Sequence, residues 1–207
     1  MFPSNFLYEA LMLYAVLDPV AAVPIFLSVT TGLNRGEQLK VAAIAIFISL
    51  LIFCFFIFIG HGLLNALHIP MASFQLAGSI ILFLFGIQMA MGRLHGDPST
   101  SPHSEGLIER AIFPLATPCI AGSGSIMTVM MLTDNVQRTR AEQLQTIVVL
   151  CVCLLLLFLV LSLSSWISRF LGRAGIEVVS RVFGLILTSV AVTNIIIAIK
   201  SSFHLSS

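Results

Sequence analysis

The sequence predicts an all-α polytopic membrane protein with six transmembrane helices, arranged as two inverted three-helix repeats. Of the 207 residues, 58% are hydrophobic and only 9% are charged, whereas ordinary soluble domains carry roughly 25% charged residues. The apolar residues gather into six runs, each close to the roughly 20 residues that a membrane-spanning helix needs. The first and fourth runs are interrupted by proline at comparable places, which predicts that helices 1 and 4 are discontinuous.

Short polar connections separate the six runs. The expected spans are 6–31, 39–62, 73–92, 110–133, 143–168 and 178–199. The longest connection is rich in Gly, Pro, Ser and Thr, a composition typical of a flexible hinge. We therefore divide the chain into a first repeat over 1–92, a cytoplasmic linker over 93–109 and a second repeat over 110–207. The N-terminus lacks the basic region of a cleavable signal peptide, so the first span is expected to be retained.

The distribution of Lys and Arg predicts an orientation. With the N-terminus outside, seven basic residues fall on the cytoplasmic side and three on the opposite side. The seven are Arg35, Lys40, Arg93, Arg110, Arg169, Arg173 and Arg181, and the three are Arg138, Arg140 and Lys200. Cytoplasmic loops carry an excess of basic residues. We therefore expect a multi-pass protein of the bacterial cell inner membrane with both termini in the periplasm.

Polar and glycine positions recur between the two halves. The matches are Asp18-Pro19 with Thr117-Pro118 at an offset of 99, Glu37 with Glu142 at 105, and Gln75, Gly78 and Gln88 with Arg181, Gly184 and Asn194 at 106. An insertion of six residues between spans four and five accounts for most of the difference between the offsets. Each half holds an odd number of spans, so the second half must enter the membrane in the opposite orientation. This is the arrangement of an inverted repeat.

The first interruption is centred on Asp18 and Pro19, with Pro24 one turn further on. Proline removes a backbone donor and breaks the helix, and the freed backbone groups must line a protein interior or a wet cavity. A carboxylate near mid-bilayer costs roughly 2.5–3.5 kcal/mol, and such residues usually mark a path for an ion, a proton or a substrate. Asp18 equally suits a cap that accepts hydrogen bonds from Val20 or Ala21, with Pro19 at the first helical position. The two roles are compatible.

The second interruption spans residues 116–125. Thr117 and Pro118 repeat the order of a capping residue followed by proline. Gly122 and Gly124 allow close approach of backbone or ligand, and serines at 123 and 125 add hydroxyl groups.

Two helix starts near mid-membrane would present free N–H groups and partial positive charge, which suit a carboxylate. Asp18, or the carbonyls released by the breaks, could receive an ammonium group, Na⁺ or a proton. A small zwitterion satisfies both demands, and a metal ion or another small solute stays open. The residues expected to bind the substrate are Asp18, Pro19, Ala21, Ala22, Pro24, Gln88, Thr117, Pro118, Ala121, Gly122, Ser123, Gly124, Ser125 and Asn194.

Several other polar and small residues lie inside the spans. Gln75, Gln88, Thr193 and Asn194 can instead serve as interhelical hydrogen-bonding residues. Gly78, Gly86 and Gly184 suit close helix packing. Glu9 and Trp166 suit the membrane interface.

The chain shows no signature of an enzyme: it contains no nucleophile elbow, P-loop, zinc-protease motif or dinucleotide fingerprint. Its four cysteines lie in hydrophobic runs and, like its histidines, lack metal-ligand spacing. The net charge of +1 does not suggest a nucleic-acid partner. We therefore predict no cofactor and no metal site, with Na⁺ or H⁺ as a candidate coupling ion. The expected partners are the lipid bilayer and a small-molecule substrate, and the oligomeric state stays open.

Two motifs carry a family resemblance. Asp18-Pro19-x-x-x-x-Pro24 and the later Pro118-x-x-Ala121-Gly122-x-Gly124 resemble those of the MarC family of bacterial inner-membrane proteins. The chain length, the six spans and an Ile-Leu-Phe segment shortly after Gly78 agree, so the resemblance covers nearly the whole chain. It implies transport of small neutral amino acids, glycine and alanine in particular. The family often has glycine where this chain has Ala21, and proline where it has Ser123.

The pattern therefore predicts a secondary transporter of small neutral amino acids that works by alternating access. One alternative is an exporter of another small solute, a drug or a metal ion. An alternative of another class is a non-transporting membrane scaffold. The paired helix breaks count against a scaffold, which has no evident need for them.

Overall fold

The computed structural model describes residues 4–92, 106–133 and 140–203, and within these ranges it is helical without any strand. Four helices are long and apolar enough to cross a membrane, or up to six if each bent helix pair is one span. This confirms the all-α membrane class. Most of the predicted linker, residues 93–105, lies outside the described residues, as do Arg93 and Arg138 of the charge count.

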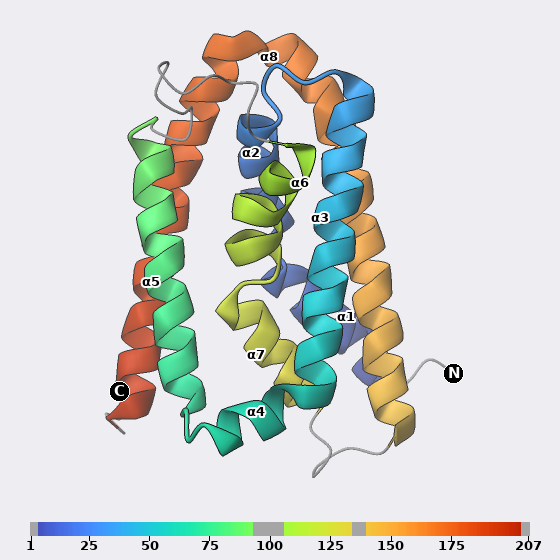
Figure 1. Cartoon of the computed structure of the whole chain (residues 1–207), viewed down its shortest axis with the longest axis vertical. Coiled ribbons are helices and arrows are strands. Elements are labelled where there is room, and N and C mark those ends of the chain that lie inside the picture. Colours follow the sequence, from blue (N-terminus) through green and yellow to red (C-terminus); the bar gives the residue numbers. More distant parts are fainter. Residues whose placement is uncertain (1–3, 93–105, 134–139, 204–207) are drawn as a thin grey trace.

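The first half of the chain contains α1 (Ser4–Val16), α2 (Pro19–Val29), α3 (Arg35–Phe55), the π-helical segment η1 (Phe56–Gly60), α4 (His61–Ala66) and α5 (Met71–Ala90). The second half contains α6 (Leu107–Arg110), the segment η2 (Ala111–Ile120), α7 (Ser123–Leu132) and α8 (Arg140–Ser202). Figure 1 shows α8 bending over at one end of the bundle. Its two apolar arms, Leu144–Ser164 and Gly175–Ser202, occupy the places of the fifth and sixth predicted spans.

Both predicted breaks are present. The axes of Glu9–Val16 and Ala21–Val29 differ by 40°, and those of Leu107–Ile120 and Ser123–Leu132 by 59°. Within η2, Phe113 and Thr117 have extended backbone angles. Each of them precedes a proline, and the proline ring disfavours the helical region for the residue before it.

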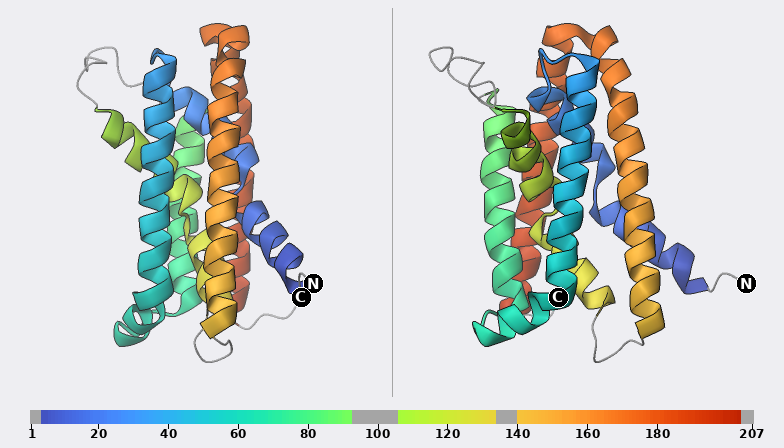
Figure 2. Two further views of the ribbon diagram at one scale, coloured as in Figure 1. Left: turned by 90° about the vertical axis from the view of Figure 1, so that its right-hand side faces the viewer. Right: turned by 45° about the vertical axis from the view of Figure 1, so that its right-hand side comes forward.

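The helix bounds recur between the two halves of the chain. The starts and ends of α1 and α2 precede those of α6–η2 and α7 by 103 or 104 residues, and the start of α3 precedes that of α8 by 105. In Figure 1, α2 runs toward the end of the bundle where α8 bends, and α7 runs toward the opposite end. The start of α1 and the end of α8 both lie toward this second end, on opposite sides of the bundle in Figure 1 (see also Figure 2).

Glycines set the closest helix contacts. A Cβ atom on Gly86 of α5 would lie 2.6 Å from Thr188 Oγ1, and one on Gly184 of α8 would lie 2.4 Å from the backbone nitrogen of Ala90. These contacts join α5 to the second arm of α8, which runs beside it in the opposite direction (Figure 1). Close packing by small residues is how membrane helices associate when their outer faces meet lipid. The sequence prediction of packing glycines is confirmed here.

Candidate functional site

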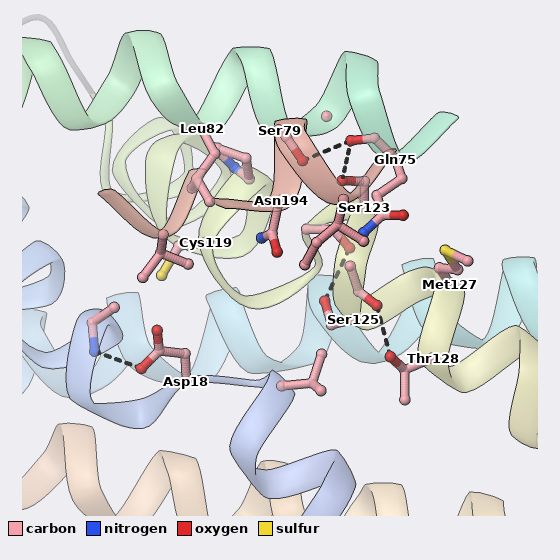
Figure 3. A pocket seen from close by; sticks show the side chains of 18 of the residues that line it. Asp18, Gln75, Ser79, Leu82, Cys119, Ser123, Ser125, Met127, Thr128 and Asn194 are labelled. Atoms are coloured by element: carbon pink, nitrogen blue, oxygen red, sulfur yellow. Dashed lines mark hydrogen bonds between the residues drawn. The ribbon is translucent and has the colours of Figure 1, made fainter. Parts of the chain in front are cut away.

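A cavity of about 450 Å³ lies where the two broken helix pairs meet. Its walls come from the start of α2, the start of α7, and faces of α5 and of the second arm of α8 (Figure 3). Asp18 and Ala21 contribute the α2 side. The α7 side is formed by Gly122, Ser123, Gly124 and Ser125.

The start of α2 carries the carboxyl group of Asp18. Asp18 has φ 45° and ψ 67°, in the left-handed region, which aspartate tolerates better than most residues. Its Oδ1 accepts a hydrogen bond of 3.1 Å from the backbone N–H of Ala21. Pro19 occupies the first helical position, where its missing N–H costs no hydrogen bond. The predicted cap at Asp18 is confirmed.

The start of α7 has no such cap. Its N-cap residue is Gly122, and among the residues that the structure describes no side-chain cap bonds to the first N–H groups of the helix. A Cβ atom on Gly122 would lie 2.6 Å from the carbonyl oxygen of Pro118, so glycine is required at this turn. The first three N–H groups of an uncapped helix have no partner in the helix, and they carry its positive dipole end.

The predicted cap at Thr117 is wrong. Thr117 Oγ1 donates to the carbonyl of Ile112 at 3.2 Å, and α7 begins only at Ser123. The physical reason is the turn that follows Pro118: the N–H of Ala121 bonds to the carbonyl of Ala116 at 2.8 Å. This bond spans five residues and delays the new helix.

Hydroxyl groups satisfy the carbonyls that the second break releases. Ser125 Oγ donates to the carbonyls of Ile120 at 2.8 Å and Gly122 at 3.0 Å. Ser123 Oγ donates to the carbonyl of Gln75 on α5 at 3.3 Å. These bonds give carbonyls at the break and on α5 a partner within the protein, and irregular backbone at membrane depth is tolerated where it is buried in protein or lines a cavity.

Eight of the fourteen predicted site residues line the cavity. They are Asp18, Ala21, Pro118, Gly122, Ser123, Gly124, Ser125 and Asn194. The structure does not bring the other six to its wall: Pro19, Ala22, Pro24, Thr117, Ala121 and Gln88. Ala22 is fully buried in the core. Gln88 is exposed, and it lies about 120° around α5 from the face that Leu82 presents to the cavity.

Three helix faces of the cavity were missed from the sequence. They supply Gln75, Gly78, Ser79 and Leu82 from α5, Met127, Thr128 and Met131 from α7, and Leu187, Val190 and Ile197 from α8. The α5 residues follow the spacing i, i+3, i+4, i+7, and so do the α7 residues counted from Gly124. This spacing marks one face of a helix. It could have identified both faces once the two breaks were located.

The comparisons with known proteins cover nearly the whole chain. Residues 4–203 match the model of the MarC family of integral membrane proteins. A UPF0056 membrane protein of Pyrococcus abyssi is 34% identical over 194 residues, which are 92% of each chain. The UPF0056 inner membrane protein YhgN of Escherichia coli K12 is 30% identical over 188 residues, 91% of this chain and 92% of its own. No solved structure gives a significant match.

Proposed function

The chain belongs to the MarC family of integral membrane proteins, and on this premise we propose that it is a secondary transporter of small neutral amino acids. The substrates in view are of the glycine and alanine kind. The inner-membrane name of the relative YhgN and the apolar helices support a multi-pass protein of the inner membrane.

The observation that carries this proposal is the opposite character of the two helix starts that face one cavity. The α2 start presents the carboxylate of Asp18, of which one oxygen already caps Ala21. The α7 start presents uncapped N–H groups at Ser123, Gly124 and Ser125. An ammonium group is attracted to the first and a carboxylate to the second. A free amino acid carries both groups on one carbon atom.

The recurring helix bounds support alternating access. Asp18 and Gly122, the N-cap residues of α2 and α7, are 104 positions apart, close to the offsets of 105 and 106 between the other matched residues. We therefore align Asp18 with Gly122 in place of Thr117. With this alignment all offsets between matched residues of the two halves lie between 104 and 106, and the insertion of six residues is no longer needed. An inverted pair of three-helix units can rock about a fixed central site and open it to each side in turn.

The coupling ion belongs to the same proposal. The carboxylate of Asp18 can bind Na⁺ or a proton. Binding of either cation would then change how strongly Asp18 attracts the ammonium group of the substrate. A scaffold needs neither an uncapped helix start nor a carboxylate facing a cavity at membrane depth, where each is costly.

The test is uptake of radiolabelled glycine and alanine into proteoliposomes that hold the purified protein, with and without Na⁺ and pH gradients. We expect saturable uptake that depends on one of the gradients. Asp18→Asn should abolish or uncouple it, since asparagine caps a helix as well as aspartate does but carries no charge. The matched control is Glu177→Gln, an exposed carboxylate that pairs only locally with Arg181. Absence of uptake under every gradient, from folded protein, would contradict the proposal.

A further inference from the structure

The cavity contains two side-chain amides that the binding of a zwitterion leaves unused. Gln75 comes from α5 and Asn194 from the second arm of α8, and both line the cavity. In Figure 3 they lie with Ser79 and Ser123 on the side of the cavity across from Asp18. They face the space that a substrate would occupy beyond its ammonium and carboxylate groups.

Both amides are available to hydrogen-bond a ligand. Within the described part of the chain, no hydrogen bond is made by the side chain of Gln75 or Asn194. The neighbouring hydroxyl groups, by contrast, already donate to the backbone. Ser79 and Ser123 both donate to the carbonyl of Gln75, and Thr128 donates to the carbonyl of Gly124. An amide without a partner is costly when water is excluded from it. A bound molecule that covers these amides must therefore replace their hydrogen bonds or lose affinity.

The surroundings of Asn194 shape the same region. Val190 and Ile197 lie one turn before and one turn after it on the same helix face, and both line the cavity. Asn194 is thus a polar residue between apolar neighbours, and a hydrogen bond made there is stronger than one in open water once a bound molecule displaces the water.

The cavity has room for a side chain. Its volume of about 450 Å³ corresponds to roughly fifteen waters at about 30 Å³ each. Glycine or alanine would fill only a small part of this space. The part beside Gln75 and Asn194 would stay open.

Resting on the amino acid transport proposed above, we infer that Gln75 and Asn194 form the subsite for the substrate side chain. The substrate class is then the neutral amino acids whose side chain bears a hydroxyl or an amide. Such a side chain can form hydrogen bonds with the amides of Gln75 and Asn194. An apolar side chain of equal size would cover the two amides and leave them without hydrogen-bond partners. A site built to hydrogen-bond a polar group discriminates strongly against the analogue that lacks it.

The experiment compares two substrates of nearly the same shape, threonine and valine. We measure KM and the maximal rate for the uptake of each into proteoliposomes. The wild-type protein should have a KM for threonine about five- to tenfold lower than for valine, the factor that one hydrogen bond of about 1 kcal/mol or slightly more supplies.

Two variants remove the amides and keep the side-chain volume. Asn194→Leu and Gln75→Met should raise the KM for threonine toward that for valine and leave the KM for valine nearly unchanged. The matched controls are Thr193→Val and Gln88→Met, because both residues are exposed on the same two helices and lie outside the cavity wall. The controls should keep the wild-type ratio. Partial misfolding lowers the maximal rate for both substrates, so the ratio of KM values reports recognition independently of folding.

Equal KM values for threonine and valine in the wild-type protein would overturn this inference and leave amino acid transport standing. A wild-type ratio that Asn194→Leu and Gln75→Met both preserve would also overturn it, because the amides would then contact the shared ammonium and carboxylate groups or nothing. Uptake of no amino acid at all would overturn the proposed function together with the subsite.

Discussion

Arg110 Nη1 donates a hydrogen bond of 3.1 Å to the carbonyl oxygen of Val29, the last residue of α2. The two residues are 81 positions apart, so a side chain from the second half of the chain bonds to the end of a helix in the first half. A similar contact exists at α7, where His61 Nε2 lies 3.2 Å from the carbonyl oxygen of Met130. Each half-helix that begins at the cavity is thus held near its C-terminal end by the other half of the chain.

We expect Arg110→Met to destabilise the protein by about 1.5 kcal/mol. The substitution keeps much of the aliphatic stem but removes a charged donor from the end of α2, and hydrogen bonds to charged groups contribute about 1.5–3 kcal/mol. The favourable interaction of the cation with the negative end of the helix is lost as well. Thermal unfolding in detergent checks this, with Arg181→Met, an exposed residue of α8, as control. Equal melting temperatures of the Arg110 variant and wild type would contradict it.

His61→Leu should cost about 1 kcal/mol, the contribution of one neutral hydrogen bond. A carbonyl oxygen only accepts, so Nε2 of His61 carries the hydrogen in this contact. The two contacts come from α6 and α4, which lie toward opposite ends of the bundle (Figure 1). The double variant His61→Leu/Arg110→Met should therefore show the sum of the single effects to within about 0.5 kcal/mol. Asn65→Ala, an exposed position on α4, is the matched control for the His61 variant.

Gly78 and Ser123 are so close that a side chain added at position 78 should be tolerated only if the side chain of Ser123 is removed. A Cβ atom at position 78 would lie 2.3 Å from both Cβ and Oγ of Ser123. Gly78→Ala should therefore push the start of α7 away from α5, cost about 1–3 kcal/mol as overpacking does, and abolish uptake. Ser123→Gly removes both clashing atoms and should restore stability in the double variant. Gly62→Ala is the control, since a Cβ atom there meets nothing within 4 Å.

The sequence predicted the broken helices because their cause is local. A proline disfavours helical angles at the residue before it, and an aspartate followed by proline is a good helix start. The long apolar runs likewise determine the spans whatever their neighbours are. These features needed no knowledge of tertiary structure.

The faces of the helices could not be predicted in the same way. Gln75 and Gln88 have the same side chain on the same helix, and only the packing of α5 decides that the first meets the cavity. Glu9, expected at the membrane interface, is only 2% exposed, and its Oε2 accepts a hydrogen bond of 3.4 Å from Thr146 Oγ1, 137 positions away. Such contacts depend on which helices become neighbours.

Two glycines at the start of α7 should respond differently to alanine. Gly122→Ala would place a Cβ atom 2.6 Å from a backbone oxygen, which cannot move aside as a side chain does, whereas a Cβ atom at Gly124 meets nothing within 4 Å. We expect Gly122→Ala to lower stability by about 1–3 kcal/mol and Gly124→Ala to leave it nearly unchanged. Melting temperatures of the two variants, compared under the same conditions, check the difference. Similar losses in both would contradict the assignment of the turn to Gly122.

The contacts of Arg110 and His61 also predict which side of the cavity opens. Cys119 lines the cavity and is partly exposed, and replacing Cys54, Cys151 and Cys153 by serine leaves it as the sole thiol. Arg110→Met frees the α2 end, so a membrane-impermeant maleimide should label Cys119 several-fold faster from that side, the cytoplasmic side in the expected orientation. His61→Leu should accelerate labelling from the opposite side. Equal acceleration from both sides in either variant would mean that the two contacts do not control separate openings.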